Sequence, residues 1–109
     1  MIDRLIAAMD TWLGPYQYPL GKWYRRRGRL GDALDSFAAA EVWLTRKEGA
    51  DHPHVVAAIV SQAACQAEIG NQAEACRQYA RALRMMEARG ESDHPTAKEI
   101  AGYLAAKCL

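Results

Sequence analysis

The sequence lacks any long uninterrupted apolar run. In its 109 residues no stretch approaches the roughly 18 consecutive apolar residues that suggest a membrane span. Residues 1–10 interrupt their apolar side chains with charged ones, unlike the core of a secretory signal. We therefore expect a protein that is neither inserted in a membrane nor exported, with a cytoplasmic location.

An excess of charge of either sign is also missing. The 14 lysines and arginines nearly balance the 13 aspartates and glutamates, which leaves a formal net charge of +1. A protein that binds nucleic acid or an anionic membrane usually carries a strong basic excess. The one dense basic run, residues 25–29, is explained as well by the favourable interaction of cations with a helix C-terminus. We therefore expect neither a nucleic acid nor a membrane as partner.

Cysteine is scarce, with only Cys65, Cys76 and Cys108 in the chain. An odd number without Cys-x-x-Cys spacing fits neither a disulfide framework nor a zinc-binding motif. All three fall within helical patterns of apolar residues. We expect buried thiols in a protein of a reducing compartment.

No residues show the pattern of a catalytic or metal centre. Cys65 and Cys76 lie among alanines with no histidine at a helical offset, whereas an enzyme needs a nucleophile, base or metal in a pocket. His52 and His54 are two residues apart, a spacing that does not bring side chains together on a helix, and no third ligand is evident near them. We expect no enzyme activity, no catalytic residue, no cofactor and no metal.

What the sequence does contain is an internal repeat. Asp-His-Pro occurs at residues 51–53 and again at residues 93–95, an offset of 42 (93 − 51). The same offset pairs Gly28 with Gly70, Ala33 with Ala75, Phe37 with Tyr79 and Ala40 with Ala82. A repeat of this length predicts a stack of units, in which each unit buries a face that its neighbour supplies.

Apolar residues recur at helical spacing in nearly every segment, and no useful length alternates as a strand would. We therefore expect an all-α fold. A first helix should end at Gly14-Pro15, because glycine accepts the left-handed cap and proline cannot continue the hydrogen-bond ladder. Further helices are expected at roughly residues 19–28, 32–49, 53–70, 71–90 and 95–108.

The first unit carries a recognisable order of small and large side chains. Its pattern is Leu20-Gly21-x-x-Tyr24, then Ala33-x-x-x-Phe37, then Ala40. This resembles the pattern of the tetratricopeptide repeat family, with Gln17 where that family usually has tryptophan. Small residues are expected where two helices of a pair cross closely, and large ones between pairs.

The second unit follows the same pattern with two departures. It keeps Ala63, Gly70, Ala75, Tyr79 and Ala82, but has Gln62 and Gln66 where a leucine and a tyrosine are expected. The 42-residue period with Asp-His-Pro at the junction is similar to the long repeat variant of kinesin light chains. The resemblance covers roughly residues 15–108.

This resemblance implies one domain, a right-handed stack of antiparallel helix pairs. Residues 1–14 would form an N-terminal helix, residues 15–50 the first repeat, residues 51–92 the second repeat and residues 93–109 a capping helix. An array this short needs both of its ends covered.

The resemblance also implies a protein–protein interaction module, an adaptor that binds a peptide of a partner on its concave side. The residues expected to face this side are Tyr18, Lys22, Arg25 and Arg26 in the first unit and Val60, Ala64, Ala67 and Glu68 in the second. The basic end suits an acidic peptide or a carboxylate, since arginine offers a fixed fork of donors. The alternative is self-association, in which the main partner is another copy of the chain.

Overall fold

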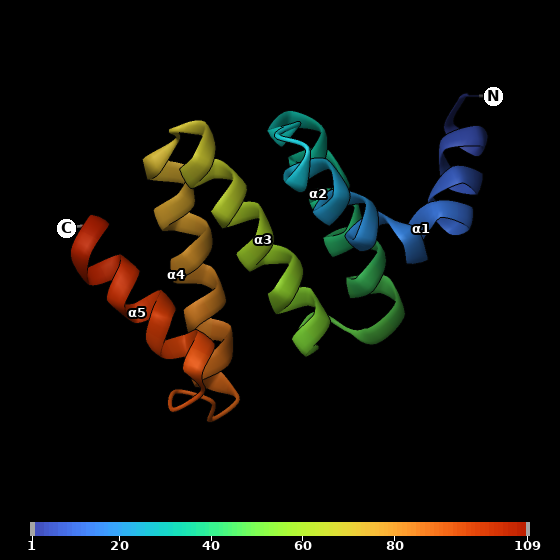
Figure 1. The fold of residues 1–109 in the computed structure, drawn as a ribbon. Helices are drawn as coiled ribbons and strands as arrows, with labels where there is room; N and C mark the ends of the chain where they lie inside the picture. The colour runs from blue at the N-terminus through green and yellow to red at the C-terminus, as the bar shows by residue number, and fades with distance from the viewer. Residues whose placement is uncertain (1, 109) are drawn as a thin grey trace.

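The computed structural model describes the backbone of residues 2–108 and the side chains of residues 13–108. Its five helices are α1 (Ile2–Arg26), α2 (Leu30–Glu48), α3 (Pro53–Ile69), α4 (Gln72–Ala88) and α5 (Pro95–Lys107). Short turns join them, and each helix packs chiefly on its neighbours in sequence, so that they follow one another across the molecule (Figure 1). The expected all-α stack of helix pairs is confirmed.

The two Asp-His-Pro sequences start their helices in the same way. In each, the imidazole Nδ1 accepts a hydrogen bond from the amide two residues later, His54 N to His52 and Thr96 N to His94, both at 3.1 Å. The proline that follows each histidine occupies the first helical turn, where its missing N–H removes no helical bond. Each of these two histidines therefore caps the helix that starts at its repeat junction.

The first helix is longer than the sequence predicted. A break at Gly14-Pro15 is wrong, because α1 continues through both residues and through Pro19. Gly14 instead allows a close contact with α2, since a Cβ at this position would lie 2.1 Å from the indole of Trp43. Proline inside a helix removes a hydrogen bond and bends the axis, and α1 is bent in Figure 1. Gly28, with a φ of +76°, follows the actual end of α1.

Small residues lie where the helices of each pair cross. Ala33 and Ala75, which are one repeat apart, are both fully buried. Ala40 and Ala82, also one repeat apart, are buried to the same degree. The offset of 42 residues therefore describes equivalent positions in the packed core as well as in the sequence.

The apolar core has two parts. The larger lies among α2, α3, α4 and α5, and it consists of Ala40, Leu44, Val55, Val56, Ala58, Ile59, Ala82, Met86, Ala97 and Ile100. The smaller consists of Ala33, Phe37 and Cys65, with Tyr18 and Tyr24 of α1 packed against it. Because two residues of α5 belong to the larger part, this helix covers the end of the second repeat as a cap should.

A polar contact is buried where the family pattern has leucine. Gln62 of α3 is only 6% exposed, and its Nε2 donates to Glu41 Oε1 of α2 at 2.7 Å. The other oxygen of Glu41 accepts from Arg81 of α4 at 2.9 Å. A buried amide without a partner would destabilise the fold. The shared carboxylate therefore explains how glutamine replaces leucine while the helix register is kept.

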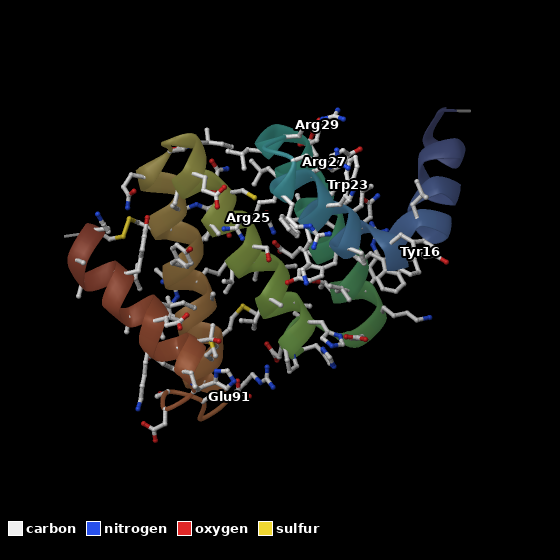
Figure 2. The ribbon with its side chains drawn as sticks, viewed as in Figure 1. Tyr16, Trp23, Arg25, Arg27, Arg29 and Glu91 are labelled. Atoms are coloured by element: carbon white, nitrogen blue, oxygen red, sulfur yellow. A yellow bond between two sulfur atoms is a disulfide. The ribbon has the colours of Figure 1, made fainter. Side chains whose placement is uncertain are left out.

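The expectation of three thiols is wrong for two of the cysteines. Cys76 of α4 and Cys108 after α5 form a disulfide with their Cα atoms 5.8 Å apart, drawn as a yellow bond in Figure 2. Cys65 is free and buried. The bonded pair is separated by 32 residues and meets only because α5 packs on α4. The cysteines therefore no longer support the expectation of a reducing compartment.

Ala75→Leu should destabilise the protein, because a larger side chain has no room at this helix crossing. Overpacking costs about 1–3 kcal/mol, which lowers the melting temperature by roughly 5 °C or more in a small domain. Ala73→Leu adds the same side chain at an exposed position of the same helix and should melt near the parent. Thermal unfolding followed by circular dichroism measures both. Equal melting temperatures for the two variants would contradict the packing described here.

Removal of the disulfide by Cys76→Ser with Cys108→Ser should lower the free energy of unfolding by about 2–4 kcal/mol in denaturant titrations. The unreduced parent should show a single reactive thiol, and only after unfolding. Burial shields Cys65 and raises the pKa of its thiol, so little thiolate is present in the folded protein. Three alkylated cysteines in unreduced protein would show that the bond is absent.

Candidate functional site

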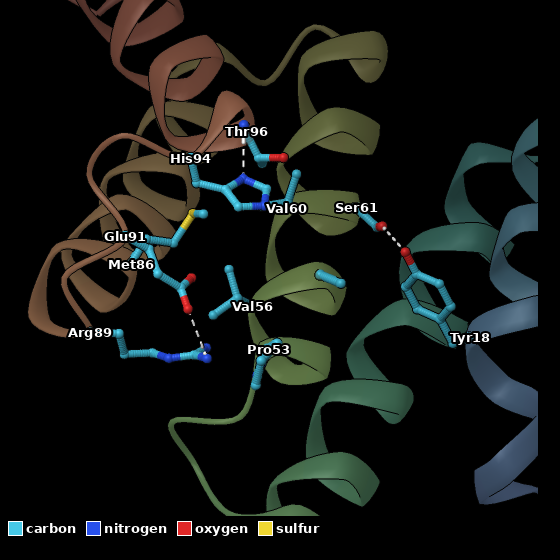
Figure 3. Close-up of a pocket in the computed structure, with 11 residues that line it drawn as sticks. Tyr18, Pro53, Val56, Val60, Ser61, Met86, Arg89, Glu91, His94 and Thr96 are labelled. Carbon is cyan, nitrogen blue, oxygen red and sulfur yellow. Dashed lines mark hydrogen bonds and ion pairs between the residues drawn. The ribbon is translucent and has the colours of Figure 1, made fainter.

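Two neighbouring hollows lie over α1, α3 and the start of α5. The first has a volume of about 290 Å³ and is lined by Tyr18, Pro53, Val56, Ala57, Val60, Ser61, Met86, Arg89, Glu91, His94 and Thr96 (Figure 3). The second has a volume of about 300 Å³ and is lined by Pro15, Tyr18, Pro19, Leu44, His54 and Ala57. Since Tyr18 and Ala57 belong to both linings, we treat the two hollows as one surface, called the groove.

The walls of the groove are largely apolar, with polar atoms at a few points. Val56, Val60 and Met86 supply much of the apolar lining of the first hollow. The hydroxyl of Tyr18 on α1 lies 3.2 Å from Ser61 Oγ on α3, which links the two helices across the groove. Apolar walls with a few convergent polar groups are typical of binding surfaces.

Arg89 brings a cation to the first hollow from the end of α4. Its Nη2 donates to Glu91 Oε1 at 2.9 Å, as Figure 3 shows. Its Nη1 is buried and has no hydrogen-bond partner in the described part of the chain. Because this nitrogen is enclosed by the protein, Arg89 contributes positive charge to the first hollow and not an exposed donor.

The predicted basic end of the groove is partly neutralised by the protein itself. Arg25 Nε donates to Glu68 Oε1 at 2.9 Å, a contact that joins α1 to α3. This hydrogen bond raises the pKa of Arg25 above its ordinary value, so the group stays charged while Glu68 offsets its charge. Lys22 Nζ lies 5.7 Å from the ring centre of Tyr18. Within residues 13–108, no acidic partner is found for Lys22 or Arg26, so the net positive charge here comes from these two.

The predicted groove residues divide into two sets. Tyr18 and Val60 line the first hollow. The remaining six lie farther along α1 and α3, outside the lining of both hollows: Lys22, Arg25, Arg26, Ala64, Ala67 and Glu68. Of these, Ala64 and Ala67 are half-buried and the four charged residues are exposed.

Sequence reasoning missed several residues that line the first hollow. They are Ser61, Met86, Arg89, Glu91, His94 and Thr96. The repeat offset contained a signal for the last two, because it makes α5 the third helix of the kind to which α1 and α3 belong. A helix equivalent to α1 and α3 forms a third wall as well as a cap.

A second cluster of polar side chains lies at the turn between α2 and α3. The ring centres of His52 and His54 are 4.6 Å apart, and Glu48 Oε2 lies 2.8 Å from the Nδ1 atom of each. Both reasons that the sequence gave against grouping these histidines are wrong. His52 precedes the helix with an extended backbone (φ −69°, ψ 143°), so helical spacing does not apply to it. Glu48 supplies a third side chain that can act as a metal ligand.

The order of helices, the buried alanines and the groove agree with one comparison to known proteins. A model of the tetratricopeptide repeat family matches residues 12–88. The chain belongs to the tetratricopeptide repeat family. Members of this family are non-catalytic modules that mediate protein–protein interactions. No curated protein and no solved structure matches the chain.

The tetratricopeptide match ends at the last residue of α4, so α5 lies beyond the matched repeats. Ala97 and Ile100 of α5 nevertheless belong to the core, and Thr96 lines the groove. The final helix therefore extends the tetratricopeptide surface by one more wall. No helix among residues 2–108 has the combined length and hydropathy that crossing a bilayer requires.

Proposed function

We propose that this tetratricopeptide repeat protein is a non-catalytic adaptor whose groove binds a peptide segment of another protein. The observation that carries the proposal is the groove itself, an apolar surface shared by α1, α3 and the start of α5. Its first hollow has room for a partner side chain. The half-buried Ala64 and Ala67 leave a smooth surface farther along α3, which suits a second apolar side chain.

The bound segment is acidic or carries a free carboxylate. Lys22 and Arg26 supply positive charge at one end of the surface, and the guanidinium of Arg89 adds positive charge to the lining of the first hollow. Arg25 contributes less to binding because Glu68 already accepts its hydrogen bonds. Charge-assisted hydrogen bonds to these donors would fix the direction of the bound chain.

Lys22→Glu with Arg26→Glu should abolish selection of acidic peptides from a displayed library of short random sequences. Loss of two charge-assisted bonds of about 1.5–3 kcal/mol each predicts affinity weaker by roughly a hundredfold or more for the selected peptide. Fluorescence anisotropy with the labelled peptide measures this affinity. Helical content and melting temperature should stay near parental, because both side chains are exposed.

A matched control is Arg46→Glu with Arg84→Glu, which makes the same charge change at exposed positions of α2 and α4. This control should bind the selected peptide as the parent does. Undiminished binding by a folded Lys22→Glu, Arg26→Glu variant would contradict the basic end of the groove. Equal losses in both double variants would show that net charge, rather than this site, governs binding.

Self-association is a second candidate, favoured by an apolar stripe on α1. Its members are Leu13, Tyr16, Leu20 and Trp23, with exposed fractions of 37, 66, 37 and 41%. Spacings of 3, 4 and 3 residues place these side chains on one side of the helix. Contiguous exposed apolar surface of this kind usually marks an interface.

Light scattering coupled to size exclusion tests this candidate over a range of protein concentrations. A dimer or larger species should appear in the parent and dissociate in Tyr16→Glu with Trp23→Glu, two positions labelled on α1 in Figure 2. The Lys22→Glu, Arg26→Glu variant should keep the parental size. A parent that is monomeric at every concentration would contradict self-association and leave peptide binding unaffected.

A cytoplasmic location stays a prediction, and the disulfide weighs against it. Disulfides persist chiefly in oxidising compartments and are rare in the cytosol. Acid quenching of intact cells, followed by alkylation of the denatured protein without reductant, would test the location. One alkylated cysteine indicates an oxidising environment, and three indicate a reducing one.

A further inference from the structure

Three metal-binding side chains meet at the turn between α2 and α3. Glu48 is the last residue of α2, His52 precedes α3 and His54 is the second residue of α3. The candidate ligand atoms of the three residues all lie within 4.8 Å of one another. Gly49, with a φ of +97°, reverses the chain between them, and His52 N donates to its carbonyl at 3.3 Å. The backbone thus holds the cluster together.

The two close contacts of His52 Nδ1 cannot both be hydrogen bonds at the same time. This nitrogen accepts the amide hydrogen of His54 at 3.1 Å, which requires its lone pair. It also lies 2.8 Å from Glu48 Oε2, where only a proton on the same nitrogen would form a hydrogen bond. Nδ1 has one lone pair, so it cannot accept the His54 amide hydrogen and serve a second partner at the same time. A metal ion bound at Nδ1 would take this lone pair in place of the His54 amide hydrogen and would also accept an electron pair from Glu48 Oε2, which lies within reach.

The junction at residues 93–95 starts a helix in the same way but lacks the two additional ligands. His94 forms the same cap as His52, with the amide of Thr96 at 3.1 Å. The positions 42 residues after Glu48 and His54 are occupied by Gly90 and Thr96, which offer neither a carboxylate nor an imidazole. The cap therefore requires only its histidine. The carboxylate and the second imidazole are additions of the first junction.

We propose that Glu48, His52 and His54 bind a divalent transition metal ion, with Zn²⁺ as the best match. Two imidazole nitrogens and one carboxylate oxygen form a donor set of zinc sites that keep an open coordination position. Imidazole excludes Ca²⁺ and Mg²⁺ as preferred ions, since both favour oxygen ligands. Tetrahedral zinc places donors about 3.3 Å apart, so the present 2.8 Å contacts widen slightly when the ion enters.

The cluster is open to solvent, so an ion can reach it. Side-chain exposed fractions are 30% for Glu48, 35% for His52 and 63% for His54. His54 also lines the second hollow of the groove. The cluster therefore lies at the edge of the groove. Metal binding does not depend on peptide binding, and each can be measured without the other.

Isothermal titration of metal-free, unreduced protein with Zn²⁺ tests the proposal. The parent should bind one equivalent. His54→Ala and Glu48→Gln should each weaken Zn²⁺ binding by about tenfold or more, because each removes one of three ligands. Co²⁺ in place of Zn²⁺ should give visible absorption bands in the parent that both variants lose.

His94→Ala is the matched control, because it removes the same helix cap from the second junction, where no ligand cluster exists. This variant and Thr96→Ala should bind Zn²⁺ as the parent does. Melting temperatures of all metal-free variants show whether each is folded, and His54→Gln replaces His54→Ala if the latter unfolds. Absence of Zn²⁺ binding by the parent, or undiminished binding by folded His54 and Glu48 variants, would overturn the proposal.

Discussion

Close contact between helices at small residues is the constraint on which the rest of this structure depends. Ala33 and Ala40 in the first repeat, and Ala75 and Ala82 in the second, are almost completely buried between the packed helices. Because both repeats share this geometry, α1, α3 and α5 become equivalent helices. Their equivalence produces one continuous groove from three helices that are distant in sequence.

Some charged side chains in and beside the groove form ion pairs within the protein, and others do not. Arg25 is held by Glu68, and one nitrogen of Arg89 is held by Glu91, so these contacts join helices or turns and reduce the net charge. Ion pairs whose side chains are partly open to solvent stabilise a fold only modestly. Under the proposed function, their larger effect is to leave Lys22 and Arg26 as the cations that an acidic segment would meet.

Departures from the repeat identify the features that are particular to this chain. Gln62 replaces the leucine of the family pattern and is accommodated because Glu41 accepts its hydrogen bond. Glu48 and His54 have no counterparts in the second repeat, although the helix start is built identically there. Residues that the common architecture does not require are candidates for a separate role, and an internal repeat reveals them without any second sequence.

The sequence by itself determined helices α2 to α5 and the family, because these features depend on residues a few positions apart or on one regular offset. Tertiary structure decided the rest. The Tyr18–Ser61 and Arg25–Glu68 contacts join residues 43 apart, and the disulfide joins residues 32 apart, so helix packing alone brings each pair together. Even the local Gly14-Pro15 signal was overridden, since the contact of Gly14 with Trp43 makes glycine a packing residue within a continuous helix.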